Sequence, residues 1–411
     1  ILSHDPITNL PNAVAITPQL RQLLKNKSPH YLALVKLTHL KLIDQNLGSQ
    51  YANLLVREVG RKATSRYGEF FLGVFRFSTF AFVIPMDAQS LAKNHLKKLM
   101  GVLFHDDIEL SGIPFHVEAH ASLTKINHAN NIKTLLRFAY TAIDESLKTS
   151  SDITLFKTEL DNMRNEDIRF VALFHKGIKS KQFKIYAQPK VDLNTNEITG
   201  YELLSRWVHP ELGFITPDHY VTKAEDSVAI HALTRYMITN GFNYFISHQL
   251  EHSNTQLAFN VSAMDLINKS FFKWLITFVE NTNINKNLIT FELTESAFMV
   301  NPKLAKKHIK LLAKLGLKIS IDDFGTGFSA FSYLKDLPIH EIKIDREFIT
   351  DISTTPRKQI IVKNIIFLAH ELNATVCAEG IETEADLTLV KSYGCDVGQG
   401  YFWSKPTPLD I

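Results

Sequence analysis

The fold of this chain is decided by an apolar run that ends in two acids and a glycine-rich turn, Leu317-Lys318-Ile319-Ser320-Ile321-Asp322-Asp323-Phe324-Gly325-Thr326-Gly327. An apolar run of this length, bounded by turn residues, is typical of a buried strand. Further runs of the same kind precede or follow it, and nearly all end in a carboxylate, amide, lysine or arginine: Ile185 to Val191, Tyr201 to Trp207, Leu257 to Ser262, Leu288 to Leu293, Glu341 to Ile344, Thr375 to Ala378 and Val397 to Phe402.

Amphipathic helices are predicted between most of these strands. Apolar residues recur at spacings of three and four in Leu304 to Leu315 and Ile360 to Leu372, the pattern of a helix with one buried face. Alternation of strand and helix over about 230 residues favours a TIM-like β/α barrel in the C-terminal half of an α/β protein. The active site of such a barrel lies at the carboxyl ends of its strands.

Polar residues lie at or near these strand ends. In chain order they are Glu202, Asn260, Glu292 with Glu295, Asp322 with Asp323, Lys343, Glu379 with Glu382, and Gln399. A barrel closes its strands into one ring, so that side chains far apart in the chain converge at one mouth. Carboxylates packed so closely repel one another by several kcal/mol, and bound cations are needed to keep them ionised. The sequence therefore predicts a metal site.

The expected metal is Mg²⁺ or Mn²⁺. Oxygen ligands without a cluster of Cys or His suit these ions better than zinc or copper, and the 17 histidines show no zinc-ligand spacing. Asp322 and Asp323 could bridge two such ions, a pair that stabilises both the attacking and the leaving oxygen of a phosphoryl displacement. The predicted chemistry is metal-dependent phosphodiester hydrolysis.

Each of these residues has a simpler explanation when it is considered alone. A single Glu292, Glu382 or Lys343 is more often a solvated charge at a strand end than a ligand, because charged residues mostly lie on surfaces. The run that begins at Asp322 could by itself be an acidic turn. Only the ordered set favours a site.

That ordered set includes several short motifs: Tyr186-Ala187-Gln188-Pro189, Gly200-Tyr201-Glu202-Leu203-Leu204-Ser205-Arg206-Trp207, His209-Pro210, Asn260-Val261-Ser262, Glu292-Leu293-Thr294-Glu295-Ser296, the run from Asp322, Lys343-Ile344-Asp345, Ala378-Glu379-Gly380-Ile381-Glu382-Thr383 and Gly398-Gln399-Gly400-Tyr401. With these motifs, the segment from Arg169 to Pro408 resembles the EAL family of cyclic di-GMP phosphodiesterases. One departure is Leu203, where the family signature has Ala. Because strand side chains alternate between faces, we expect Leu203 to point into packing, away from Glu202.

The resemblance implies a role for each matching residue. It assigns one metal to Glu202, Asn260, Glu292 and Asp322, and the second metal to Asp322 and Asp323. It assigns catalytic roles to Lys343, Glu379 and Glu295, of which Glu295 steadies the loop after Asp323. It assigns contacts with cyclic di-GMP to Gln188, Arg206 and Gln399, and a supporting position behind them to Glu382. Since that loop lies near the dimer interface in the family, the resemblance also implies a homodimer through this domain.

The first 157 residues resemble a different family. His4-Asp5-Pro6-Ile7-Thr8-Asn9-Leu10-Pro11-Asn12 is similar to the opening of a GGDEF, or diguanylate cyclase, domain, and Phe138 to Leu147 is similar to its closing helix. This resemblance implies an α+β fold. Lys36 stands where the family has its first metal-binding aspartate, and Ser78-Thr79-Phe80-Ala81-Phe82 replaces the signature turn. A lysine cannot bind Mg²⁺, so we expect no cyclase activity and a regulatory or dimerisation role.

The predicted domains are therefore residues 1–157 and 158–411, with a charged linker from about Phe156 to Asp167 that is either a helix or an exposed hinge. A net charge of +3, not concentrated in blocks, gives no support for polynucleotide binding. The two cysteines, Cys377 and Cys395, provide no disulfide framework and favour a reducing, cytoplasmic setting. Because the first residue, Ile1, is not a methionine, a sensor or membrane segment could precede the chain.

Two functions from different classes remain open at this point. The first is hydrolysis of cyclic di-GMP to linear pGpG. The second is a receptor that binds the dinucleotide without cleaving it and signals by a conformational change. The complete ligand set favours the hydrolase, because receptors of this type usually lack one or more of the acids.

Overall fold

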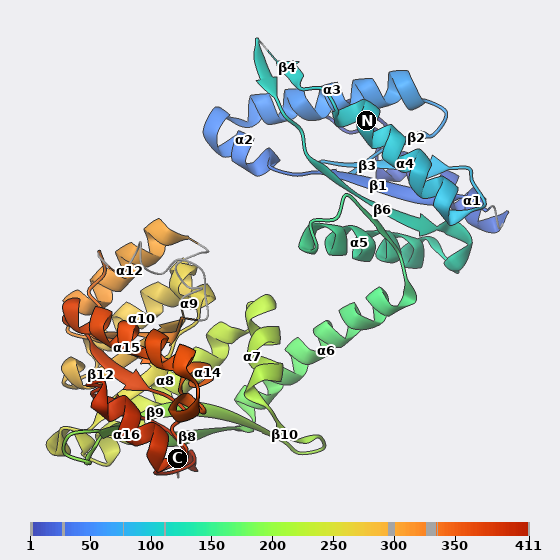
Figure 1. The fold of residues 1–411 in the computed structure, drawn as a ribbon. Helices are drawn as coiled ribbons and strands as arrows, with labels where there is room; N and C mark the ends of the chain where they lie inside the picture. Colours follow the sequence, from blue (N-terminus) through green and yellow to red (C-terminus); the bar gives the residue numbers. More distant parts are fainter. Residues whose placement is uncertain are drawn as a thin grey trace. The chain divides into compact units, whose positions relative to one another are not determined.

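The computed structural model describes residues 3–26, 29–76, 78–110, 112–294, 301–325, 334 and 336–409. The chain divides into two compact units, Ile1–Glu166 and Asp167–Ile411, and Figure 1 shows the elements of each. Within the described parts of the chain, no helix combines the length and the hydrophobicity that crossing a bilayer would require.

The N-terminal unit is an α+β domain built on a five-stranded sheet of order β2-β3-β1-β6-β7. The strands are β1 (Tyr31–Leu37), β2 (Phe71–Arg76), β3 (Thr79–Ile84), β6 (Ala119–Lys125) and β7 (Ile153–Leu155), and a separate ribbon joins β4 (Ile108–Leu110) to β5 (Ile113–Phe115). The helices are α1 (Ala13–Lys25), α2 (Leu40–Leu47), α3 (Ser49–Tyr67), α4 (Gln89–Phe104) and α5 (Ile132–Lys148).

Successive residues of β1 belong to different cores. Val35 packs with buried residues of α3 and α4, whereas Leu34 packs with residues of α1 and α5. This alternation follows from the two-residue repeat of a strand. The sheet therefore carries helices on both faces, as a layered α+β domain requires.

The hairpin between β2 and β3 carries the segment that replaces the cyclase signature. Strand β2 ends at Arg76 and β3 begins at Thr79. Phe80 and Ala81 are fully buried, and Lys36 pairs with Thr79 across the sheet. Apolar core residues thus occupy the positions where the resemblance would place the acidic pair.

The predicted linker is helical. A single helix, α6 (Thr158–Lys179), covers most of it, and the boundary between the compact units, after Glu166, falls inside this helix. Its first turns are joined to α5 by two ion pairs, Arg137 with Asp161 at 3.0 Å and Arg164 with Asp144 at 3.4 Å. Of the two alternatives for this segment, the structure shows the helix.

The C-terminal unit is a closed barrel, as predicted. Its strands are β8 (Phe183–Asp192), β9 (Ile198–His209), β11 (Gln256–Asn260), β12 (Ile289–Thr294), β13 (Lys318–Phe324), β14 (Glu341–Ile344), β15 (Thr375–Ala378) and β16 (Val397–Gly398), and pairing of β8 with β9 closes the ring. Short strands β10 (Gly213–Ile215) and β17 (Thr407–Pro408) extend it. The helices are α7 (Pro217–Asp226), α8 (Ile230–Ser247), α9 (Ala263–Ile267), α10 (Lys269–Asn281), α12 (Pro302–Lys314), α14 (Arg346–Ile349), α15 (Pro356–Glu371) and α16 (Glu384–Ser392).

The barrel departs in one respect from the usual arrangement of eight parallel strands. Strand β8 runs antiparallel to both of its neighbours, β9 and β16. Its residues therefore ascend the barrel in the reverse order: Gln188 lies opposite Glu202, and Lys190 lies opposite Gly200. Gln188 consequently reaches the level of the predicted acids, whereas Lys190 lies closer to the amino-terminal ends of the parallel strands.

Candidate active site

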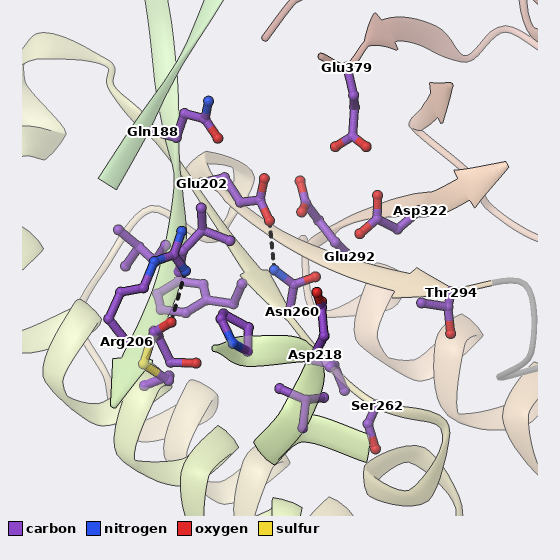
Figure 2. Close-up of a pocket in the computed structure, with 18 of the residues that line it drawn as sticks. Gln188, Glu202, Arg206, Asp218, Asn260, Ser262, Glu292, Thr294, Asp322 and Glu379 are labelled. Carbon is purple, nitrogen blue, oxygen red and sulfur yellow. Dashed lines mark hydrogen bonds between the residues drawn. The ribbon is translucent and has the colours of Figure 1, made fainter. Parts of the chain in front are cut away.

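Four carboxylates from different strands surround one buried lysine inside the barrel. The Nζ of Lys343 on β14 lies 3.3 Å from an oxygen of Glu202 on β9, 2.9 Å from one of Glu292 on β12, 3.0 Å from one of Asp322 on β13 and 2.6 Å from one of Glu379, which follows β15. Figure 2 shows the four acids facing one another across the mouth. Closure of the barrel thus brings these predicted site residues together.

Two overlapping groups of these acids have the spacing of a metal site. Oxygens of Glu202, Glu292 and Asp322 lie within 4.8 Å of one another, and so do oxygens of Asp322, Asp323 and Glu379. Asp322 belongs to both groups. All of these ligand atoms are carboxylate oxygens, the donor type that Mg²⁺ and Mn²⁺ prefer. The residues therefore fit a pair of hard divalent cations that share Asp322.

The neighbours Asp322 and Asp323 both face the mouth because the strand is irregular at this point. Adjacent residues of a regular strand point to opposite faces. Here the pairing of β13 with β14 shifts register between Ile321 and Phe324, and Asp323 adopts a left-handed backbone with φ of 53°. A non-glycine residue in that region carries about 1–3 kcal/mol of strain, and such strain is concentrated at functional sites.

Amide side chains complete the surroundings of Glu202. Asn260 donates to Oε1 of Glu202 at 2.7 Å, and Gln399 donates to Oε2 at 2.7 Å and to Gln188 at 3.1 Å. The Oε1 of Gln399 is buried and has no hydrogen-bond partner among the described residues. Asn260, Gln188 and Gln399 are thus assembled around the carboxylate of Glu202, and the Oε1 of Gln399 accepts no hydrogen bond from the described residues.

The acids differ sharply in how readily they ionise. Burial alone would raise the pKa of Glu202, but the Lys343 ammonium and hydrogen bonds from Gln399 and Asn260 lower it to about 2. Burial raises the pKa of Glu379 to about 8, and repulsion from Asp322 and Glu202 reinforces the effect against the opposing charge of Lys343. The single positive charge of the Lys343 ammonium therefore does not neutralise all the carboxyl groups around it.

Two further carboxyl groups have the same deficit of positive charge. Burial and the neighbouring Asp322 raise the pKa of Asp323 to about 7. Burial and repulsion from Glu202 raise the pKa of Glu292 well above its ordinary value, although Lys343 and Lys190 oppose the shift. A site that gathers acids with too few cations would be stabilised by added divalent charge.

A cavity of about 530 Å³ opens from these acids toward α7 and α8, within the range of roughly 300–1,000 Å³ that is usual for small-molecule sites. Its far wall is apolar and includes Val221, Leu233 and Met237. Arg206 lines it beside the acids, donates to the backbone oxygen of Ser205 at 2.9 Å and is visible in Figure 2. Its guanidinium is a planar group suited to phosphate oxygens.

Two predicted residues stand apart from this assembly. Glu382 is exposed at the rim, where it lines the same cavity as Glu379. Glu295, and with it the turn from Thr326, lies outside the described residues.

The structure also shows charged residues that the sequence did not single out. Lys190 on β8 lies 2.5 Å from Glu341 and 3.3 Å from Glu292, inside the barrel. The signal for them was weak: Lys190 is one charged residue within the predicted strand Ile185 to Val191, and Glu341 begins a predicted strand. A charged side chain requires an oppositely charged partner only when it is buried in the barrel interior, and the sequence does not show that Lys190 and Glu341 are buried there.

Leu203 lies on the other face of β9 from Glu202, as predicted. It is buried in the hydrophobic core, and a Cβ atom added to Gly241 on α8 would come within 2.7 Å of its Cδ1. The larger side chain at this position is thus accommodated by a glycine on the covering helix.

Comparison with known proteins gives a consistent result for both units. A family model described as EAL domain matches residues 172–406, and one described as diguanylate cyclase, GGDEF domain matches residues 2–152. Both predicted resemblances are confirmed. The EAL match covers more than half of the chain, which is sufficient to assign the chain to a protein family.

Relatives and solved structures agree with these matches. The chain is 29% identical over 378 residues to a cyclic di-GMP phosphodiesterase of Pseudomonas aeruginosa, covering 91% of this chain and 64% of that protein. It is 28% identical over 415 residues to the cyclic di-GMP phosphodiesterase NbdA of the same species, covering 99% of this chain and 53% of that protein. The chain thus spans less than two thirds of the length of these relatives. The structure of the phosphodiesterase PaMucR in complex with c-di-GMP is similar with a TM-score of 0.56 and 30% identity, covering 59% of this chain and 98% of that one.

Proposed function

Because this chain belongs to the EAL-domain family, we propose that its barrel hydrolyses cyclic di-GMP to linear pGpG. Water adds across one phosphodiester: a bond forms between phosphorus and the water oxygen, and the bond from phosphorus to the ribose 3′ oxygen breaks. The product keeps a 5′ phosphate and gains a free 3′ hydroxyl. One observation carries the proposal, namely that three acids of the predicted ligand set, Glu202, Glu292 and Asp322, converge with the predicted catalytic residue Glu379 on one buried point, Lys343.

The proposed metal ligands are Glu202, Asn260, Glu292 and Asp322 for one ion, and Asp322 and Asp323 for the second. When bound, two Mg²⁺ or Mn²⁺ ions would neutralise the acids, polarise the phosphate and make water more acidic. Glu202 is held ionised, with a pKa of about 2, as a ligand must be, whereas the pKa values of Glu292 and Asp323 are raised in the metal-free chain and divalent charge would favour their ionised forms.

The remaining site residues are assigned to substrate and proton handling. Lys343 would offset negative charge that develops at the phosphate, since its ammonium is buried at the centre of the acids. Glu379 would accept a proton from the attacking water in its ionised form, which bound divalent charge would favour by opposing the burial and the repulsion from Asp322 and Glu202 that raise its pKa to about 8 in the metal-free chain. Arg206, Gln188 and Gln399 would orient the dinucleotide.

We further propose that the N-terminal unit does not synthesise cyclic di-GMP. Lysine at position 36, and core residues at positions 80 and 81 in place of an acidic pair, leave no carboxylates to hold the cations of a nucleotide triphosphate at these positions. Its role would be regulation or dimerisation. The proposed homodimer through the barrel unit can be checked by light scattering of the purified chain.

The test is incubation of the purified chain with cyclic di-GMP and Mg²⁺ or Mn²⁺, followed by chromatography of the nucleotides. We expect pGpG to appear, and a Glu202→Ala variant to lose turnover by at least a hundredfold. A matched control is Glu211→Ala, an exposed acid outside the cavity, which should leave turnover unchanged. Tight binding of intact dinucleotide without cleavage would instead identify a receptor.

A further inference from the structure

The carboxylate of Glu292 is held by two different lysines, one on each oxygen. Its Oε2 lies 2.9 Å from Nζ of Lys343, and its Oε1 lies 3.3 Å from Nζ of Lys190. The Glu292 side chain has no exposed surface. Two cations on opposite oxygens define the plane of a carboxylate, whereas a single contact leaves it free to rotate about its last torsion.

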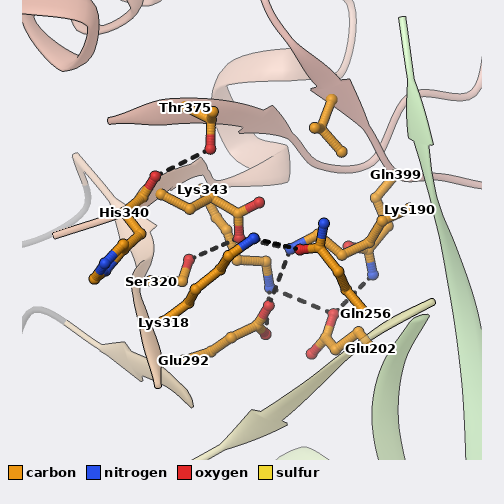
Figure 3. Close-up of polar contacts among 12 residues, drawn as sticks. Lys190, Glu202, Gln256, Glu292, Lys318, Ser320, His340, Lys343, Thr375 and Gln399 are labelled. Carbon is orange, nitrogen blue, oxygen red and sulfur yellow. Dashed lines mark hydrogen bonds and ion pairs between the residues drawn. The ribbon is translucent and has the colours of Figure 1, made fainter. Parts of the chain in front are cut away.

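Lys190 is in turn fixed from the floor of the barrel. Its Nζ lies 2.5 Å from Oε1 of Glu341, and the hydroxyl of Ser320 donates to the same oxygen at 2.9 Å. Both charged side chains are almost completely buried, with 9% and 12% of their surfaces exposed. Figure 3 shows Lys190, Glu292 and Lys343 within one continuous set of polar contacts.

The antiparallel direction of β8 is what brings Lys190 to this level. Lys190 pairs with Gly200 on β9, and a Cβ added to Gly200 would lie 2.5 Å from the backbone oxygen of Gln256. The close approach of β11 thus requires glycine at this position, and no side chain projects there opposite Lys190. The lysine thus approaches Glu292 from the side opposite the cavity.

We propose that Lys190 is a positioning residue for the active site: it orients Glu292 so that its Oε2 faces the group formed with Glu202 and Asp322, and Glu341 with Ser320 holds Lys190 in place. This inference rests on the proposed function, because it takes Glu292 to be a metal ligand. Lys190 is not among the residues that line the cavity, and within the described residues its ion pairs are with Glu292 and Glu341, so that its direct contact with the acids of the mouth is made through Glu292.

A different role for Lys190 would be simply to neutralise Glu341. The two roles are separated by comparing Glu341→Gln with the double variant Lys190→Met/Glu341→Gln, which differ only in the lysine and carry no charge at position 341. Removal of a nearby positive charge should by itself tighten cation binding. Loss of the orienting contact should weaken it. The two effects have opposite signs.

The experiment is calorimetric titration of the metal-free full chain with Mn²⁺, paired with unfolding in urea followed by tryptophan fluorescence. We expect the double variant to bind Mn²⁺ at least tenfold more weakly than Glu341→Gln, at a similar unfolding midpoint. A similar midpoint is expected because Lys190 has already lost its partner Glu341 in the single variant, and Glu292 keeps its ion pair with Lys343 in both variants. Equal or tighter binding by the double variant overturns the inference.

The matched control is Lys318→Met, because Lys318 donates to Gln256 at 3.3 Å on the same floor of the barrel and, within the described residues, makes no ion pair with Glu292. It should bind Mn²⁺ no more weakly than the wild type does. If the double variant does not fold, Lys190→Arg is the second test, because arginine preserves the charge but moves the hydrogen-bond donors. A positioning role predicts weaker Mn²⁺ binding by this variant, whereas a role in neutralising Glu341 predicts unchanged Mn²⁺ binding.

Measurements on the wild-type chain separate the role of Lys190 from the proposed hydrolysis. A wild-type chain that neither binds Mn²⁺ nor cleaves cyclic di-GMP overturns the proposed function and this inference together. A wild-type chain that does both, with a double variant that matches Glu341→Gln, overturns the role of Lys190 alone.

Discussion

Replacement of Lys343 by methionine removes an ammonium that contacts four acids of the mouth: Glu202, Glu292, Asp322 and Glu379. Methionine preserves most of the side-chain length without the charge. In the absence of divalent cations, we expect this variant to unfold much more readily than the wild type, because its buried carboxylates lose their shared partner.

The size of the effect follows from the contacts. At about 3 Å and an effective dielectric constant of about 20, one pair of unit charges attracts by roughly 5 to 6 kcal/mol before desolvation is subtracted. Removing one partner of a buried pair costs roughly 3 to 5 kcal/mol in practice, since the remaining charge is left without compensation. We therefore expect the free energy of unfolding to fall by about 3 to 5 kcal/mol in EDTA, and added Mg²⁺ to recover part of the loss.

Tryptophan fluorescence during unfolding in urea measures this quantity for the barrel alone. All 3 tryptophans of the chain, Trp207, Trp274 and Trp403, lie in the C-terminal unit. The control is Lys306→Met, which removes an exposed pair with Asp336 at 2.7 Å and should cost less than about 1 kcal/mol. If Lys343→Met and Lys306→Met had equal stability in EDTA, the ammonium would not be the counter-ion of the site and the reasoning would be wrong.

Three other outcomes are expected. Burial raises the pKa of Glu379 from 4.5 to about 8, so that between these pH values the folded metal-free barrel holds a proton that the unfolded chain has already released. The free energy of unfolding should therefore fall as pH rises from about 4.5 to 8. The Glu379→Gln variant should flatten this dependence in urea titrations at several pH values. For each ion bound, Mg²⁺ at a hundredfold excess over its Kd should raise barrel stability by about 2.7 kcal/mol. Asp322→Asn, which removes an acid from both candidate clusters, should abolish most of that gain, and retention of the full gain would argue against the shared ligand. Leu203→Ala should lose about 2–5 kcal/mol of stability through the cavity left against Gly241, with turnover close to wild type; a large loss of turnover would show that this position also shapes the site.

Much of the fold could be predicted from the pattern of residues. Apolar runs separated by amphipathic segments predicted the barrel, and the strands Glu341–Ile344 and Thr375–Ala378 occur with the predicted bounds. Strand length is limited by how many apolar residues are available between turn residues, and this is a local property. The same locality explains why Leu203 could be assigned to the packing face from alternation alone.

The contacts inside the barrel could not be predicted from the sequence and are known only from the tertiary structure. Lys190 was not singled out, because its partners Glu292 and Glu341 are about a hundred residues or more away in the chain and a lysine in a strand is ordinarily a surface residue. Nor does the sequence reveal that β8 runs against its neighbours, since hydrophobic alternation has no direction.

The sequence alone determined the order of acids, amides and lysine along the strands, because a strand presents its side chains in a regular alternation whatever surrounds it. Whether Asp322 and Asp323 could point to one side was decided by the tertiary structure, through the register shift beside β14 and the left-handed backbone at Asp323. The physical reason is that pairing between strands, and not the local chain, determines where a strand must bulge.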